Sequence, residues 1–297
     1  MSDLEVRRAR EEDREAVLAF CQQTWEWGDY IDRVWETWLN DEQGALLVAL
    51  KEGQPVGVAN IRMLNAQEAW MEGMRVDPAY RQQGIASALF DAQIAEARQR
   101  GATTARLITE STNASAIRLI ERSPMRRVSA HAPYKAGLLS ATTKRRAYGL
   151  ETPVLATTAD IDEAIEYLNV SNIFPAVGGL YSQGFTALTL TTELIEQKVR
   201  EQQLYLLRRW GRLDGLMICE PRENYGGRHL FIGYIDGTTE SISLLAYALR
   251  VMLPQYGLEQ AQANVPDLMM VRDAFTGAEY EWDGYIFYTY EWVLKER

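Results

Sequence analysis

Hydrophobic residues in the first half of the chain recur at two different spacings. Over residues 30–40 they lie three and four positions apart, which predicts a helix with one apolar face. Shorter runs that are continuously or alternately apolar are typical of strands. The helical spacing is found at residues 12–23, 30–40, 84–100 and 113–122. The strand-like runs are found at residues 4–9, 45–50, 56–64, 69–76, 103–109 and 128–134.

The second half of the chain repeats this order of patterns. The segment "VLATTADIDEAIEYLN" (154–169) parallels "VRRAREEDREAVLAFC" (6–21), and "HLFIGYIDGTTESISLLAYAL" (229–249) parallels "WMEGMRVDPAYRQQGIASALF" (70–90). A generic αβ pattern can also produce such a likeness, but we interpret it as two copies of one unit that pack as an internal pseudo-dimer. The expected domains are residues 1–140 and 152–297, joined by a linker at 141–151, and the expected fold class is α+β.

Composition narrows the classes of function. A net charge of −10 and a pI near 4.9 argue against general binding of nucleic acid, which requires a basic surface. No signal peptide and no apolar run of the roughly 20 residues that span a bilayer are evident, so a membrane role is not expected. The two cysteines, Cys21 and Cys219, are expected to be buried and reduced, as in the cytoplasm. With only two histidines, neither a metal site nor a histidine-based triad is expected.

The stretch "VDPAYRQQGIASAL" (76–89) is the clearest candidate for a binding site. It stops a strand at a proline and then opens a long helix at Gly84. The first turn of a helix carries amide groups without internal partners, and the helix dipole adds partial positive charge there. Gly84 lets an anion approach the backbone, while Arg81 adds a cation. The stretch therefore predicts a phosphate site in an acidic protein.

The residues Arg81-Gln82-Gln83-Gly84-Ile85-Ala86 fit the pattern Arg/Gln-x-x-Gly-x-Gly/Ala of the GNAT acyltransferase superfamily. The resemblance covers most of residues 4–134. It also extends, more loosely, to the histidine N-acetyltransferase-like branch through "EGMRVDPAYRQQGIA". It implies two tandem GNAT-like domains, each a mixed twisted sheet flanked by helices. A P-loop and a Rossmann fingerprint are excluded, because the required lysine and glycines are missing.

The resemblance also implies acetyl-CoA as the coenzyme. Its pyrophosphate would be held by the turn and the helix start, and its pantetheine arm would pair with the preceding strand. The expected coenzyme residues are Met74, Arg75, Val76, Arg81, Gln82, Gln83, Gly84, Ile85, Ala86, Ser87, Asn113 and Ala116. Asn113 is also expected to cap its helix, which is its ordinary structural role. The arginines Arg118, Arg122, Arg126 and Arg127 are either ligands of the outer phosphate or a solvated charged face.

The second copy lacks this motif. In an ungapped match Glu240 falls at the position of Arg81, and Ser243 falls at that of Gly84. A carboxylate at a helix start satisfies its positive end and repels a pyrophosphate. We therefore expect the second copy to have kept the fold and lost the coenzyme, and it is a candidate wall for the acceptor pocket of the first.

Candidate catalytic residues lie on the strands beside the motif. Glu72 is the first choice for the base, because even-numbered residues place it on one face with Val76. An ordinary salt bridge is the alternative reading of Glu72, and Glu110 is the second choice of base. In the resembled family a tyrosine seven residues after the asparagine often serves as acid, but here that position is Ile120.

The segment "WEWGDY" (25–30) joins the first two helices, where the resembled family places its acceptor. Aromatic and acidic groups together suit a cationic amine, although these rings also suit a plug at the end of the core. The expected acceptor residues are Trp25, Trp27, Asp29 and Tyr30. The sequence predicts an N-acetyltransferase that acts on a small amine or amino-acid-like molecule by direct attack, as a monomer or a homodimer. The alternative is a non-catalytic acetyl-CoA sensor.

Overall fold

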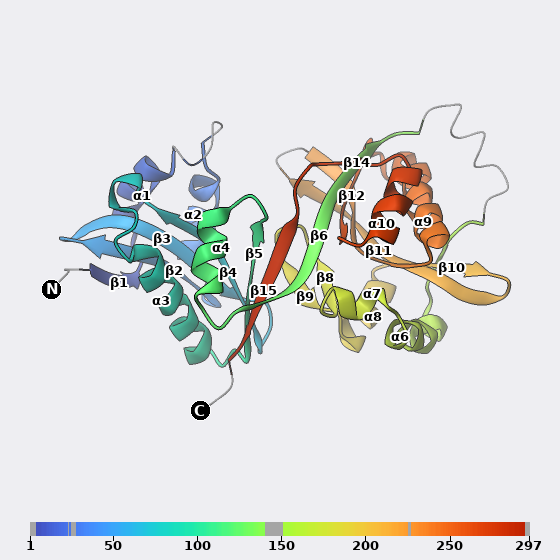
Figure 1. Cartoon of the computed structure of the whole chain (residues 1–297), viewed down its shortest axis with the longest axis horizontal. Helices are drawn as coiled ribbons and strands as arrows, with labels where there is room; N and C mark the ends of the chain where they lie inside the picture. The colour runs from blue at the N-terminus through green and yellow to red at the C-terminus, as the bar shows by residue number, and fades with distance from the viewer. Residues whose placement is uncertain (1–3, 23, 25–27, 140–150, 225–226, 295–297) are drawn as a thin grey trace. The chain divides into compact units, whose positions relative to one another are not determined.

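The computed structural model describes residues 4–22, 24, 28–139, 151–224 and 227–294, and they form two compact units (Figure 1). Unit 1 consists of Met1–Ile108, Ala114–Arg126 and Tyr290–Arg297, and unit 2 consists of Thr109–Asn113 and Arg127–Thr289. Each unit has the same ground plan of helices followed by an antiparallel meander, a long helix and a parallel strand. The α+β class expected from the sequence is confirmed.

Unit 1 is a sheet with helices on it. Its strands are β1 (Leu4–Arg8), β2 (Gly44–Lys51), β3 (Gln54–Met63), β4 (Glu68–Val76) and β5 (Thr104–Glu110), in that order in the sheet. Its helices are α1 (Arg14–Cys21), α2 (Ile31–Leu39), α3 (Ile85–Gln99) and α4 (Ala114–Glu121), with 3-10 turns at Glu11–Asp13 and Pro78–Tyr80. All pairs from β1 to β4 are antiparallel, and β4 and β5 are parallel.

The long helix α3 packs closely on the middle of this sheet. A Cβ atom on Gly57 of β3 would lie 2.9 Å from Ile85 and 3.0 Å from Leu89, so only glycine allows this approach. Ile85 and Leu89, four residues apart, are buried on the same face of the helix, as the apolar spacing predicts. The glycine therefore fixes the distance between the start of α3 and the strand beside it.

Unit 2 repeats the plan with additions. Its strands are β6 (Arg126–Gly137), β7 (Val154–Leu155), β10 (Leu204–Arg209), β11 (Arg212–Asn224), β12 (Gly227–Gly237), β13 (Gln260–Pro266) and β14 (Glu281–Trp282), besides a separate hairpin of β8 (Leu180–Ser182) and β9 (Ala187–Thr189). Its helices are α6 (Ile161–Asn169), α7 (Ile173–Ala176), α8 (Thr192–Arg200), α9 (Thr239–Met252) and α10 (Met269–Gly277), with 3-10 turns at Thr158–Asp160 and Leu253–Tyr256. The strand order is β6-β13-β12-β11-β10-β7, and β14 pairs with β6.

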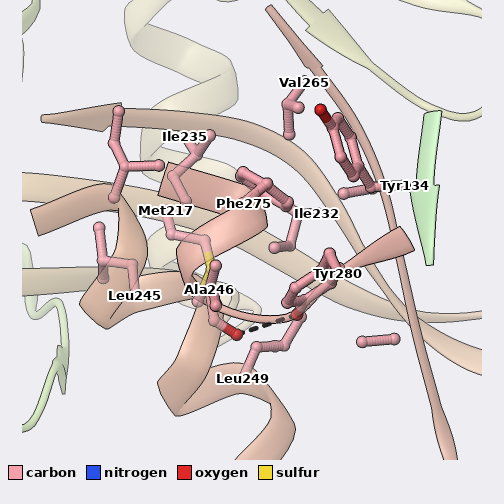
Figure 2. Packing of buried hydrophobic residues seen from close by; sticks show 14 of the residues in the cluster. Tyr134, Met217, Ile232, Ile235, Leu245, Ala246, Leu249, Val265, Phe275 and Tyr280 are labelled. Carbon is pink, nitrogen blue, oxygen red and sulfur yellow. Dashed lines mark hydrogen bonds between the residues drawn. The ribbon is translucent and has the colours of Figure 1, made fainter. Parts of the chain in front are cut away.

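The core of unit 2 lies between this sheet and helices α9 and α10 (Figure 2). Phe275 lies between two tyrosines, with ring centroids 5.2 Å from Tyr134 and 4.9 Å from Tyr280. The Tyr280 hydroxyl donates a 2.9 Å hydrogen bond to the carbonyl of Ala246, so its one polar group is satisfied. Full burial of a side chain such as Phe275 contributes about 1.5–3 kcal/mol.

Both cysteines are buried and form no disulfide, as the sequence predicts. Burial raises the pKa of the Cys21 thiol to about 12 and also raises the pKa of Cys219, so both are protonated at neutral pH. No helix in the described part of the chain is long and apolar enough to cross a membrane.

The two units exchange segments, so their boundary differs from a single cut near residue 140. The sequence assigns residues 128–134 to the first domain, but Arg127–Gly137 of β6 belongs to unit 2 and pairs with β13. Conversely, the end of β15 (Phe287–Val293) belongs to unit 1, where this strand follows β5. Local periodicity identifies a strand but does not identify its neighbour, which is why the exchange was missed.

A buried ion triad fixes β15 to unit 1. Arg106 of β5 binds Glu68 of β4 and Glu291 of β15, each at 2.6 Å, and its side chain is only 7% exposed. Trp292 stacks on Phe90 of α3 at 6.5 Å between ring centroids. Removing one partner of such a network leaves an uncompensated buried charge.

We expect Arg106→Ala to lower the free energy of unfolding of unit 1 by about 3–5 kcal/mol, because two buried carboxylates would lose their cation. Urea denaturation followed by circular dichroism measures this loss. The matched control is Arg8→Ala, since Arg8 also pairs with a glutamate, Glu96, but its side chain is 60% exposed. An exposed pair contributes about 0–1 kcal/mol. Equal losses in the two variants would contradict the structural role of the triad.

Candidate functional site

The start of α3 is an open helix end. Asp77 closes the strand by accepting a 2.9 Å hydrogen bond from the amide of Ala79. Gln82 and Gly84 both have left-handed backbone angles, with φ of 62° and 83°, and no side chain of the described residues caps Gly84. The Ala88 amide makes the first backbone bond of the helix, to the Gly84 carbonyl at 3.0 Å. The amides of residues 85–87 precede that bond, so they point toward a possible anion.

Two cations lie beside this helix end. Arg81 is exposed, and its Nε donates a 3.4 Å hydrogen bond to the Val76 carbonyl. Lys51, at the end of β2, donates to the side-chain oxygen of Gln83 and lies 5.5 Å from the Tyr80 ring. The sequence did not single out Lys51, because it comes from a strand that lies distant in the chain. The helix end thus combines free amides, a partial positive charge and two side-chain cations.

The strand that leads to the helix end separates from its neighbour. The parallel pairing of β4 and β5 ends at Trp70 and Arg106, although β4 continues to Val76. Beyond Trp70, the part of the chain that the structure describes shows no further pairing between these two strands. An extended chain can pair with such a strand edge through backbone hydrogen bonds.

A bulge in β4 decides which side chains share a face. In the ladder with β3, Glu72 faces Asn60 and Arg75 faces Val58, so β4 contains one extra residue. Gly73 has a φ of 69°, which favours glycine. The bulge shifts the alternation, so Glu72 shares its face with Arg75. The expectation that Glu72 shares a face with Val76 is therefore wrong, because it assumed a regular strand.

Glu72 lies in a partly buried polar cluster. Its Oε1 accepts hydrogen bonds from the Asn60 side chain at 3.1 Å and from Arg62 Nε at 2.9 Å. Burial raises the pKa of the Glu72 carboxyl, although the Arg62 cation opposes this rise and the charge of Asp41 adds to it. The salt bridge considered from the sequence is present, and it accompanies a raised pKa that is typical of catalytic carboxyls.

The connection before α2 is anchored on the same face of β4. Arg75 Nε binds Asp29 at 2.7 Å, and the Asp29 side chain is only 4% exposed. The Arg75 guanidinium also lies 5.3 Å from the centroid of the Tyr30 ring, which packs edge-on against Trp38. The Arg75 side chain is thus committed to Asp29, and only its backbone remains for the expected coenzyme role. Trp25 and Trp27 lie outside the described residues.

The remaining candidates are dispersed. Glu110 and Asn113 belong to the segment Thr109–Asn113 of unit 2, so the site in unit 1 is described without them. Ala116 lies in the first turn of α4, and Ile120 of the same helix is buried. A cavity of about 220 Å³ lies between α3 and the end of α4. Its lining includes Ser87, Asp91, Arg122 and Trp292.

The equivalent helix start in unit 2 is occupied. Gly215 packs against Ser241 and Leu245 as Gly57 packs against Ile85 and Leu89, which places Glu240 inside the first turn of α9. The ungapped match that put Glu240 at the position of Arg81 is therefore wrong by three residues. The Thr238 hydroxyl accepts from the amide of Ser241 at 3.2 Å, so it caps the helix. Arg209 binds both Glu240 oxygens, at 2.7 and 2.9 Å.

In unit 2 the hairpin of β8 and β9 occupies the place where β12 and β13 would separate. β12 also has a bulge, with Gly233 as its extra residue, where a Cβ atom would lie 2.2 Å from the Ser182 carbonyl and 2.3 Å from the Tyr181 ring. Asn264 of β13 donates a 2.9 Å hydrogen bond to the Gly184 carbonyl in the same hairpin. The hairpin of β8 and β9 therefore contacts both strands where they would otherwise part. Its strands are too short to be recognised from periodicity.

No group of acidic, histidine or cysteine side chains that could hold a metal occurs among the described residues.

We expect Gly73→Ala to lower the free energy of unfolding by about 2–4 kcal/mol, which combines backbone strain and overpacking. The added Cβ atom would lie 2.6 Å from the Trp38 ring. Gly53→Ala is the control, because its φ of 78° is equally left-handed but no atom lies within 4 Å. Its loss should be about 1–2 kcal/mol. Equal losses, measured by urea denaturation, would show that the bulge does not pack as described.

Known proteins resemble parts of this chain in sequence and the whole of it in fold. Residues 10–123 match the model of the acetyltransferase (GNAT) family. Histidine N-acetyltransferases of Oreochromis niloticus and Scomber australasicus are 29% and 27% identical over 98 and 88 residues. These matches span 32% and 29% of this chain and only 29% and 26% of the relatives.

Solved structures extend the likeness over both units. A putative acetyltransferase from Thermoplasma acidophilum has a TM-score of 0.57 at 16% identity, over 97% of this chain and 99% of that one. A GCN5-related N-acetyltransferase from Sphaerobacter thermophilus has a TM-score of 0.57 at 12% identity, over 99% and 96%. At these identities the likeness concerns the fold alone. Residues 10–123 therefore match the GNAT family by sequence, and over the rest of the chain the likeness is one of fold.

Proposed function

We propose that this chain is an acetyl-CoA-dependent N-acetyltransferase whose coenzyme binds to unit 1. The observation that carries the proposal is the uncapped start of α3 directly after the strand that leaves its parallel neighbour. A diphosphate attached to an extended, hydrogen-bonding arm fits such a pair of features.

The coenzyme contacts follow from this geometry. The amides of residues 82–87 would hold the pyrophosphate, and Arg81 and Lys51 would add charge. The backbone of residues 74–76 would pair with the pantetheine arm. Arg122, which lines the cavity beside Ser87, is the best placed of the four arginines for the outer phosphate. Unit 2 would hold no coenzyme, since Glu240, Thr238 and the hairpin occupy the equivalent places.

The chemistry would be direct attack in a ternary complex. The amine nitrogen forms a bond to the acetyl carbonyl carbon, and the bond from that carbon to sulfur breaks. A backbone amide at residues 74–76 would stabilise the oxyanion. Glu72 would accept the proton of the amine, because its raised pKa suits a general base. Buried Ile120 offers no proton to the thiolate, so solvent would supply it.

The acceptor would be a small amine or an amino-acid-like molecule. Two of the relatives are named for acetylation of histidine, which carries an α-amine. Glu72 and its ion-pair partner Arg62, 2.9 Å away, provide both signs of charge for such a zwitterion. Ile120 favours one alternative, a protein that binds acetyl-CoA without turnover.

We expect Gly84→Glu to weaken coenzyme A binding more than tenfold, which corresponds to ~1.4 kcal/mol, because a carboxylate would compete for the amides. Isothermal titration should give one site per chain in the wild type. Gly101→Glu is the control, since Gly101 has the same φ, 82°, and the same open surroundings at the other end of α3. Wild-type affinity in Gly84→Glu, or two binding sites per chain, would refute the proposal that coenzyme A binds at the start of α3.

We expect Glu72→Gln to lower kcat about 10²–10⁴-fold while the affinity for coenzyme A stays unchanged. Two further variants each remove one charge near Glu72 and should shift its pKa in opposite directions. Arg62→Gln removes a cation that lowers the Glu72 pKa, so the acid limb of kcat/KM should move to higher pH. Asp41→Asn removes an anion that raises this pKa, so the limb should move to lower pH. Shifts in the same direction would exclude Glu72 as the base.

The enzyme itself is tested with amino acids, polyamines, aminoglycosides and peptides as acceptors. Absence of turnover with all of them would refute the acetyltransferase and favour the alternative, a protein that binds acetyl-CoA without turnover.

A further inference from the structure

Unit 2 contains a hollow that has no counterpart in the chemistry proposed above. It lies at the C-terminal end of α9, beside β7 and β10, and its volume is about 600 Å³. This is within the usual range of about 300–1,000 Å³ for sites that bind small molecules. The side chains that dominate its lining are Tyr205, Tyr247, Tyr256, Leu244, Val251 and Met252.

Unit 1 shows which contacts close the corresponding position at the end of its long helix. The packing of Gly57 on Leu89 and of Gly215 on Leu245 aligns α3 with α9. Counted from these leucines, Glu96 corresponds to Met252 and Arg100 corresponds to Tyr256. In unit 1, Glu96 binds Arg8 of β1 at 3.0 Å and Arg100 at 3.4 Å. These ion pairs tie the end of α3 to the sheet edge.

In unit 2 the same end of the helix carries neither charge. Met252 and Tyr256 line the hollow instead, and the Tyr256 hydroxyl lies 2.9 Å from that of Tyr205. Methionine and tyrosine thus replace the charged contact, and the described lining of the hollow combines apolar side chains with a pair of hydroxyl groups. Such a combination of aromatic walls and few polar groups is typical of ligand sites.

The charges of the lining restrict the ligand. Among the described residues that line the hollow there is no lysine, arginine or histidine. Its one charged side chain, Glu151, is bound by Arg209 at 2.6 Å. Among these described residues a phosphate group would lose its hydration without gaining a cation, whereas an uncharged molecule would not incur that cost.

We propose that this hollow is a binding site for a small, uncharged, largely apolar molecule that contains an aromatic ring. The rings of the three tyrosines and the Met252 side chain contact its body, and the Tyr205–Tyr256 hydroxyl pair supplies its polar contact. This site is separate from the coenzyme site of unit 1, so it stands or fails independently of the proposed acetyl transfer.

The test uses the neutral fluorescent probe N-phenyl-1-naphthylamine with the full chain. We expect a saturable rise in fluorescence with one site per chain, which coenzyme A does not displace. Ala248→Trp adds an indole to the lining and should weaken binding of the probe at least about tenfold. Met269→Trp is the matched control, because it adds the same indole at a position of unit 2 that is 80% exposed and outside the lining.

A second variant keeps the test valid if Ala248→Trp does not fold. Met252→Glu restores the carboxylate that unit 1 carries at the equivalent position, and it should also weaken binding by desolvating a charge. Circular dichroism establishes that both variants fold. Absence of saturable binding to the wild type, or unchanged binding in folded Ala248→Trp and Met252→Glu, would overturn the proposal.

Discussion

The early end of pairing between β4 and β5 is the constraint on which the site depends. Up to Trp70 the two strands form an ordinary parallel ladder. Beyond it, the Gly73 bulge changes which side chains share a face of the strand and brings Glu72 and Arg75 to one face. The same strand then ends at Asp77, so that the open end of α3 follows directly. The irregular strand β4 thus determines the position of Glu72, the expected base. It also positions the backbone expected to pair with the pantetheine arm and the start of α3, the expected anion site.

The two units differ in what packs against the bulged strand before the long helix. Both have a glycine bulge in the strand before the long helix, at Gly73 and Gly233. In unit 1 the bulge packs on Trp38, and the pairing of β4 with β5 ends before it. In unit 2 the hairpin that contains Tyr181 packs on the bulge and bonds to the next strand. The two units therefore share a fold although they differ at this strand edge, since the packing of sheet and helix does not depend on the edge being open.

Much of unit 1 could be predicted from local patterns. The helices and strands lie within a few residues of the predicted ranges, and Gly84 is the first residue before α3 as its motif indicates. The failures concern register and partners. The alternation argument for Glu72 failed because one bulged residue inverts every later position. Lys51 was missed because a hairpin brings it to Gln83 from a distance, and the strand exchange was missed because periodicity does not name a neighbour.

The assignment of residues 290–294 to unit 1 has a consequence for how the protein is made. Domains generally fold one after another as they leave the ribosome, beginning with the N-terminal one. Here the sheet that carries α3 and Glu72 lacks Glu291 and Trp292 until all of unit 2 has been synthesised. Arg106 would remain without one of its two carboxylates during all of that time. Completion of the first unit therefore follows synthesis of the second.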